Sequence, residues 1–127
     1  MEAKNLRIGN LIKSKLLGTM HKIEGIVNKN NKIYLYTDLQ DASSDIKDWE
    51  YVSITDKLLK KLSFNNGVIM LNDSFDYISI KLNTEYFDNV VIGNKRHGVG
   101  LQYKIEYAHQ LQNLFFAVKN TELEIEQ

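Results

Sequence analysis

The densest set of side chains that could bind a ligand lies in residues 93–98, Gly-Asn-Lys-Arg-His-Gly. Lys95, Arg96 and His97 offer positive charge and N–H donors, and the Asn94 amide adds another donor. The two glycines permit backbone angles at which successive N–H groups point at one anion. The segment therefore predicts an anion site, with a solvated hairpin loop as the alternative. It matches neither the phosphate-binding loop nor the dinucleotide fingerprint, which both join a strand to a helix.

Aromatic residues suggest a second kind of binding. Tyr34 and Tyr36 are two residues apart in an expected strand, so both side chains point to one face of the sheet. Trp49 and Tyr51 follow in the next expected strand. Such rings can stack on nucleobases, and they also fill small barrels routinely. Base stacking by Tyr34 and Tyr36 is therefore a hypothesis beside simple packing.

The remaining histidines and aspartates offer little metal chemistry. His21 lies in an expected strand, where a partly buried or surface histidine is commoner than a ligand. His109 has Asn113 one helical turn away, which favours a hydrogen-bonding cluster. Four aspartates recur at three- or four-residue spacing: Asp38, Asp41, Asp45 and Asp48. They lack the glycine and closing glutamate of a calcium loop, so we expect solvating charge, no metal, no cofactor and no recognisable catalytic residue.

Composition narrows the partners. Sixteen basic residues balance 16 acidic ones, so no long-range field attracts nucleic acid or an anionic membrane. Arginine, which reads guanine bidentately, is present only as Arg7 and Arg96. Cysteine is absent, which excludes disulfides and thiolate chemistry. No apolar run is long enough for a membrane span or a signal peptide, and we expect a cytoplasmic protein.

The elements that position these residues begin with four strands, which combine alternating polarity with β-branched and aromatic residues. They are expected at residues 6–12, 20–27, 32–37 and 49–54. Gly9-Asn10 predicts a bulge or tight bend, and the polar residues 28–31 predict a hairpin turn. Residues 38–48, with few apolar members, predict a surface loop. We expect a strongly bent antiparallel sheet that resembles an SH3-like barrel.

The second half predicts a short helix over residues 56–62, capped by Ser53 or Thr55 with Asp56 in its first turn. Four strands then form an antiparallel meander, at residues 67–71, 75–82, 90–92 and 99–105. A terminal helix over 106–119 packs on this meander. The fold class is α+β in a single domain of residues 1–127, with a subdivision into 1–54 and 55–127 as the alternative.

The terminal helix carries apolar residues beyond its main stripe, which consists of Tyr107, Ala108, Leu111, Leu114, Phe115 and Val118. His109, Gln112 and Phe116 lie beyond the edge of that stripe. A phenylalanine in such a place either reaches another part of the same core or contacts another chain. We expect intramolecular packing, with a homo-oligomer interface through Phe116, His109 and Gln112 as the alternative.

Two stretches near the ends of the chain carry a resemblance. The sequence LRIGN at residues 6–10 and HQLQNLFFA at residues 109–117 are similar to short uncharacterised proteins of Bacteroidetes genomes and their phages. The resemblance spans nearly the whole length, although the intervening strands match in pattern alone. No activity is known for that set, so the resemblance implies a phage or mobile-element origin and transfers no catalytic residue.

Together these features favour a non-enzymatic accessory protein of phage or mobile-element type. It would act by binding a host protein or a nucleotide-like signal of host defence, which is an anti-defence role that rests on origin and size. A nucleic-acid-binding module and a small enzyme with an unrecognised site are the alternatives. None of these functions requires a membrane.

Overall fold

The computed structural model describes residues 1–72, 76–82, 89–94, 100–119 and 121–123. The described chain is α+β, as the sequence predicts. It forms two compact units. Unit 1 comprises Met1–Ser53 and Tyr107–Leu114, and unit 2 comprises Ile54–Glu106 and Phe115–Gln127. The subdivision considered from the sequence assigns the whole terminal helix to the second half, whereas the first part of that helix belongs to unit 1.

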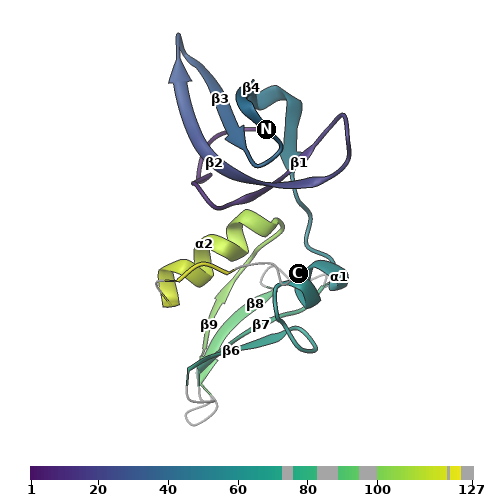
Figure 1. Cartoon of the computed structure of the whole chain (residues 1–127). Helices are drawn as coiled ribbons and strands as arrows, with labels where there is room; N and C mark the ends of the chain where they lie inside the picture. The colour runs from purple at the N-terminus through teal and green to yellow at the C-terminus, as the bar shows by residue number, and fades with distance from the viewer. Residues whose placement is uncertain (73–75, 83–88, 95–99, 120, 124–127) are drawn as a thin grey trace. The chain divides into compact units, whose positions relative to one another are not determined.

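Unit 1 contains five antiparallel strands in the order β4-β3-β2-β1-β5, of which Figure 1 labels β1 to β4. They are β1 (Leu11–Ser14), β2 (Met20–Lys29), β3 (Lys32–Thr37), β4 (Gln40–Asp45) and β5 (Trp49–Tyr51), with a 3-10 turn, η1 (Ile46–Asp48), before β5. The first four strands form a meander, and β5 returns to pair with β1. The expected antiparallel sheet is therefore confirmed. In the described chain β4 and β5 are its two edges, so the sheet does not close into a barrel.

The first predicted strand begins too early. Residues 6–10 form turns, in which the Leu6 N–H donates to the Ala3 carbonyl and the Asn10 side chain accepts from the Arg7 N–H at 2.8 Å. Gly9 adopts a φ of 97°, which confirms the tight bend predicted there. Because the Asn10 side chain bonds to the local backbone, it competes with strand pairing, and β1 starts at Leu11.

The loop predicted over residues 38–48 is also wrong, because it contains β4 and η1. The β4 sequence, QDASSD, has no apolar alternation that would mark it as a strand. An edge strand needs only one neighbour to satisfy its backbone, and here β3 supplies that neighbour. The strand is thus specified by pairing rather than by its own residues.

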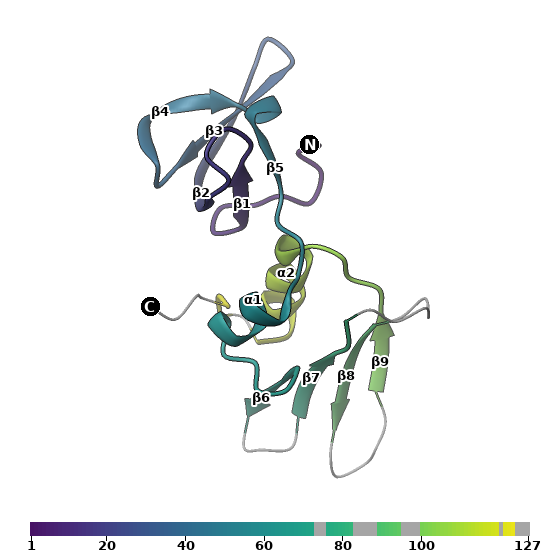
Figure 2. The ribbon, with the colours of Figure 1, turned by 90° about the vertical axis from the view of Figure 1, so that its right-hand side faces the viewer.

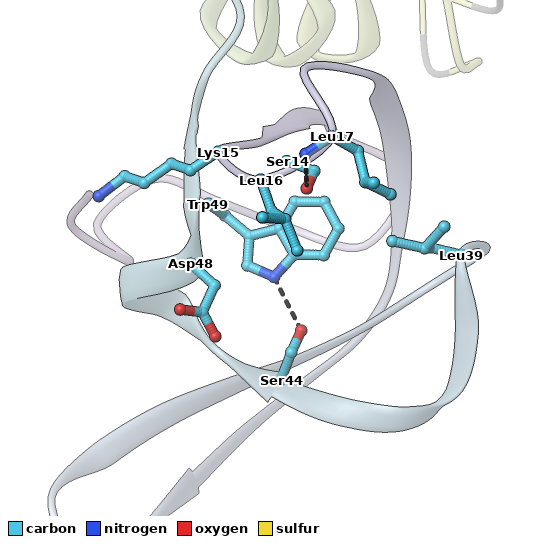
Figure 3. A pocket seen from close by; sticks show the side chains of 8 residues that line it. All are labelled: Ser14, Lys15, Leu16, Leu17, Leu39, Ser44, Asp48 and Trp49. Carbon is cyan, nitrogen blue, oxygen red and sulfur yellow. Dashed lines mark hydrogen bonds between the residues drawn. The ribbon is translucent and has the colours of Figure 1, made fainter.

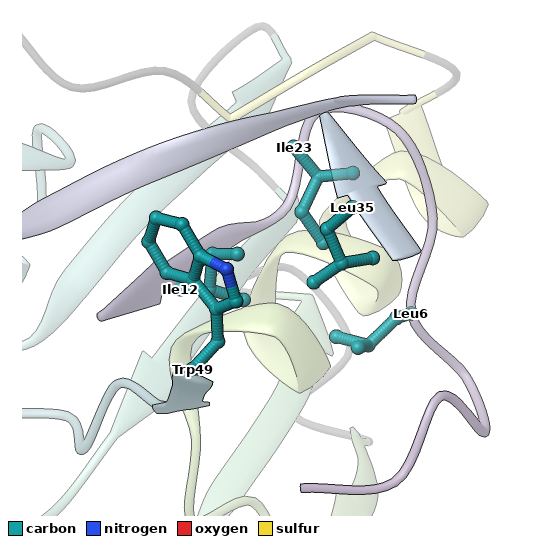
Figure 4. Close-up of a cluster of buried hydrophobic side chains, with 5 residues drawn as sticks. All are labelled: Leu6, Ile12, Ile23, Leu35 and Trp49. Carbon is teal, nitrogen blue, oxygen red and sulfur yellow. The ribbon is translucent and has the colours of Figure 1, made fainter. Parts of the chain in front are cut away.

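The core of unit 1 is a cluster of five buried apolar side chains from the N-terminal turn and the strands (Figure 4): Leu6, Ile12, Ile23, Leu35 and Trp49. Leu35 is fully buried while its neighbour Tyr36 is exposed, so the alternation predicted for residues 32–37 is confirmed at these two positions, whereas Ile33 and Tyr34 are both partly buried. Trp49, the single tryptophan of the chain, is 2% exposed. The indole of Trp49 therefore belongs to the core of unit 1.

Unit 2 contains α1 (Asp56–Lys61) and four strands, β6 (Val68–Asn72), β7 (Asp76–Ile80), β8 (Val90–Asn94) and β9 (Gly100–Tyr103). Figure 2 shows the strands side by side in the order β6-β7-β8-β9, which is the predicted antiparallel meander. The Thr55 hydroxyl caps α1 by accepting from the Leu58 N–H at 3.1 Å, and Asp56 lies in the first turn. The sequence predicted both features.

The terminal helix α2 (Ala108–Lys119) begins in unit 1 and continues in unit 2. Its first residues attach to unit 1 through the Ala108 N–H, which donates to the Val52 carbonyl at 2.8 Å, and through a bridge between Tyr107 and Ser53. No helix within the described ranges is long and apolar enough to cross a membrane.

Candidate functional site

The anion site predicted at residues 94–97 is described only at its first residue. Asn94 ends β8, where its side-chain amide donates to the Asp76 carboxylate across the strand pair. Gly93, expected to provide loop flexibility, also lies in β8, and a Cβ there would stand 2.5 Å from the Tyr77 ring. Its lack of a side chain thus makes room for Tyr77. Lys95, Arg96 and His97 lie outside the described residues, so the anion site stays a prediction.

The two tyrosines considered for base stacking lie on the outer face of β3. Tyr36 is 39% exposed and its ring packs over Gly25 of β2, where an added Cβ would stand 3.3 Å from the ring. Tyr34 pairs with Val27 and is partly buried. The Tyr36 ring is thus engaged by its cross-strand neighbour, and base stacking by the two tyrosines stays a hypothesis.

The polar residues of α2 form a hydrogen-bonded group with the N-terminal turns, which we call the amide network. Gln112 is 2% exposed; its side-chain oxygen accepts from the Leu11 N–H at 2.8 Å, and its nitrogen donates to the Gly9 carbonyl at 3.1 Å. Asn113 accepts from the Asn10 amide at 2.9 Å. The LRIGN and HQLQN segments, which carry the resemblance noted above, therefore bind each other within unit 1.

His109 lies beside this network in an aromatic stack. It is 4% exposed, with its ring centroid 4.7 Å from that of Tyr51 and 6.0 Å from that of Tyr107. Its Nδ1 atom has no hydrogen-bond partner in the described part of the chain. Burial lowers the pKa of His109 below its ordinary value, so the ring is neutral at pH 7. His109 and Gln112 are thus interior residues, and Phe116, 37% exposed, is the predicted interface residue that reaches the surface.

A pocket of about 720 Å³ opens on the surface of unit 1 beside Trp49 (Figure 3). We call it the Trp49 pocket. Its lining comes from the turn after β1, the turn after β3, β4, and the junction of η1 with β5: Ser14, Lys15, Leu16, Leu17, Leu39, Ser44, Asp48 and Trp49. The Trp49 indole N–H donates to the Ser44 hydroxyl at 2.8 Å, which fixes the ring across the pocket. The indole is therefore held in place at the inner wall of the pocket, and only 2% of Trp49 is exposed.

Three leucines form the apolar sides of the Trp49 pocket. Leu16 is 91% exposed, Leu17 55% and Leu39 39%. The turn that presents the first two is held by Ser14, whose carbonyl accepts from the Gly18 N–H at 2.8 Å and whose hydroxyl accepts from the Leu17 N–H at 3.1 Å. Gly18 has a φ of 70°, a conformation that favours glycine. The backbone of this turn thus fixes the positions from which Leu16 and Leu17 extend into solvent.

Two opposite charges lie at one edge of the pocket, across from Leu17 and Leu39 (Figure 3). The Lys15 N–H donates to the Asp48 carbonyl at 3.1 Å, so the two residues are neighbours, yet their side chains point apart in Figure 3. Neither the Lys15 ammonium nor the Asp48 carboxylate forms an ion pair with any described residue. The pocket therefore has an apolar centre with one positive and one negative charge at its rim.

His21 connects the two turns that carry the leucines. Its Nε2 lies 2.6 Å from the Thr19 hydroxyl, and its Nδ1 lies 3.0 Å from an Asp38 carboxylate oxygen. Its ring also meets Trp49 edge-on, with the centroids 5.7 Å apart. This arrangement sets the spacing between the turns. A hydroxyl, an imidazole and a carboxylate in a row are also the groups that activate a hydroxyl as a nucleophile.

Sequence reasoning missed the Trp49 pocket. It treated Trp49 as a neighbour of the tyrosines and assigned Asp38 and Asp48 to solvating charge. The signal that could have revealed the pocket is Leu16-Leu17, two consecutive large apolar residues between Lys15 and Gly18 in a turn, where polar residues are usual.

Within the part of the chain that the structure describes, no three His, Asp or Glu side chains lie close enough to hold a metal ion. No family model matches the chain, and neither a curated protein nor a solved structure matches it. A proposal for the function must therefore be based on the geometry of unit 1.

Proposed function

We propose that the protein acts by binding another protein, and that the Trp49 pocket receives an apolar side chain of this partner. The observation that carries the proposal is the exposure of Leu16 and Leu17 on a rigid turn beside an open apolar pocket. Adjacent exposed leucines of this kind typically mark an interaction site.

The energetics favour a protein segment as the occupant. Fully burying a leucine side chain gains about 1.5–3 kcal/mol, so covering Leu16 and Leu17 supplies a driving force that needs no charge. A rigid indole surrounded by aliphatic side chains has the composition of a binding hot spot. We therefore expect a short segment with one large apolar side chain, flanked by polar residues that meet Lys15 and Asp48.

A host protein is the partner that fits this surface better than a nucleotide-like signal. The rim of the Trp49 pocket carries a single lysine, and Asp48 opposes it, so a phosphate gains little there. The resemblance to phage-associated proteins supports a bacterial host protein as the partner and the host cytoplasm as the place of action. By binding such a host protein, the protein would act against host defence.

Peptide selection against the immobilised full-length protein tests this proposal. We expect the selected peptides to share one large apolar residue, to change the emission of Trp49, and to lose binding to Leu16→Lys. The matched control is Ile8→Lys, because Ile8 is also exposed in unit 1, at 60%, and does not line the pocket. Peptides that bind Leu16→Lys as well as the wild type would contradict the proposal.

The hydrogen-bonded row of Thr19, His21 and Asp38 supports one second candidate, a small enzyme that transfers an acyl group. Thr19 Oγ would attack the acyl carbon of an ester as His21 Nε2 takes its proton, and His21 would then protonate the leaving alcohol. Water would next attack the acyl-threonine, releasing the carboxylic acid and restoring the Thr19 hydroxyl. Hydrolysis of a chromogenic ester, compared for wild type, Thr19→Val and Thr19→Ser, tests this candidate. Activity that Thr19→Val abolishes and Thr19→Ser retains supports it, while equal activity in all three excludes it.

A further inference from the structure

We infer that a second copy of this chain occupies the Trp49 pocket in a two-fold dimer, with Leu16 of each copy inserted beside Trp49 of the other. This inference rests on the proposed function, since both require the pocket to accept an apolar side chain. It adds that the protein covers its own binding surface until a partner replaces the second copy.

The first argument is that one face of unit 1 carries both a projection and a matching hollow. Leu16 is 91% exposed, so it covers little of the pocket it borders. The pocket, at about 720 Å³, leaves room for a further aliphatic side chain. A two-fold interface brings the same patch of both copies together, so each projection can meet the other copy's hollow. Few unrelated partners offer both features at once.

The second argument is charge. Lys15 and Asp48 are neighbours at one edge of the pocket and have no ion-pair partner among the described residues. A two-fold axis that passes between these two residues, beside the pocket, places Lys15 of one copy opposite Asp48 of the other, and the reverse pair forms by symmetry. The formal net charge of the chain is zero, so two copies approach without long-range repulsion. The rim is thus complementary to itself.

The size of the patch sets the strength of the contact. Stable interfaces bury about 1,200–2,000 Å² in total, and the eight residues that line this pocket form a much smaller patch on each copy. We therefore expect a weak, reversible dimer. A dimer of this strength leaves the pocket available to a tighter partner.

Sedimentation velocity of the full-length protein at increasing concentration, with charge-reversal variants, tests the inference. Wild type should show a reversible monomer–dimer equilibrium. Lys15→Glu and Asp48→Lys should each dimerise about tenfold more weakly or worse, because each faces a like charge across the axis. An equimolar mixture of these two variants should dimerise again, since both cross-axis pairs then have opposite charges. This recovery in the mixture requires the two residues to face each other across the interface.

Two further variants complete the test. Leu16→Lys should be monomeric, whereas Phe116→Lys, on the exposed part of α2, should dimerise like the wild type. A monomeric wild type at every concentration, a mixture that stays monomeric, or a dimer that Phe116→Lys alone disrupts would each overturn the inference. Peptide binding to the pocket is measured separately by Trp49 emission. Absence of a dimer would therefore overturn this inference without deciding the proposed function, which the peptide measurement tests.

Discussion

Two regions of unit 1 contrast in what their side chains leave unsatisfied. In the amide network, Gln112 is almost fully buried, and both its oxygen and its nitrogen bond to backbone atoms of the N-terminal turns. In the Trp49 pocket the backbone turn is well bonded, yet it presents Leu16 and Leu17 to solvent. In the amide network the polar groups hold α2 against the N-terminal residues, whereas in the Trp49 pocket apolar side chains stay exposed to solvent.

The contrast separates residues that stabilise the fold from residues that act on something else. Removing a group from the amide network leaves buried backbone atoms without partners, which costs stability. Replacing an exposed leucine changes stability little and removes contact surface. Variants of the amide network should therefore change stability, and variants of the Trp49 pocket should change binding.

Gln112→Ala should be the most damaging substitution. It leaves the Leu11 N–H and the Gly9 carbonyl without their partner and opens a cavity, so we expect a loss of about 3–5 kcal/mol in the free energy of unfolding. Chemical denaturation provides the measurement. The matched control is Gln110→Ala, which removes the cap to the Tyr107 N–H from a side chain that is only partly buried and should cost about 1 kcal/mol. Equal losses would contradict the network as described.

His109 should make stability depend on pH. Burial keeps the pKa of His109 in the folded state below the ordinary value of 6.5. At pH values between the two pKa values, the histidine is therefore protonated in the unfolded chain and neutral in the folded chain. The free energy of unfolding should therefore fall as pH drops below 6.5 toward the folded pKa, by at most about 1.4 kcal/mol per pH unit. His109→Phe should remove this contribution. Thermal unfolding between pH 7.5 and 5, over which roughly one proton is at stake, measures it.

Ser44→Ala tests the link between the fold and the pocket. It removes the hydrogen bond from the Trp49 indole, so we expect a loss of about 1 kcal/mol in stability. Because the ring is then less firmly held, peptide affinity should also fall. If affinity falls while Trp49 emission of the free protein is unchanged, the indole was not oriented by Ser44.

Leu16→Lys should leave stability within about 0.5 kcal/mol of the wild type, because the side chain is already exposed. The same variant should lose binding of the selected peptides. Denaturation and peptide titration of one preparation give both values. A marked loss of stability would show that Leu16 belongs to the fold, as Gln112 does.

The sequence predicted those features that neighbouring residues determine. The Thr55 cap, the bend at Gly9 and the alternation around Leu35 each depend on a few adjacent residues. The unpredicted features depend on distant ones. Gln112 and Gly9 are 103 residues apart, and β4 becomes a strand because β3 lies beside it. The two segments of the amide network stood out in the sequence, but nothing in their residue types indicated that they bind each other.

The Trp49 pocket was hidden for the same reason. Leu16, Leu39 and Trp49 come from three separate segments, and only the pairing of β1 with β5 and β3 with β4 places those segments around one opening. Each leucine alone is an ordinary surface residue. Their function as a group depends on the turn geometry that Ser14 and Gly18 provide.

Amide NMR of the isotope-labelled protein, recorded with and without a selected peptide, tests the central claim most directly, because one spectrum reports on both regions. We predict that peptide shifts the Trp49 indole N–H and the backbone resonances of Leu16, Leu17 and Leu39. The side-chain amides of Gln112 and Asn113 should stay in place. Shifts concentrated at Gln112 and Asn113, with an unmoved Trp49 indole resonance, would contradict the assignment of binding to the pocket and of the network to the fold.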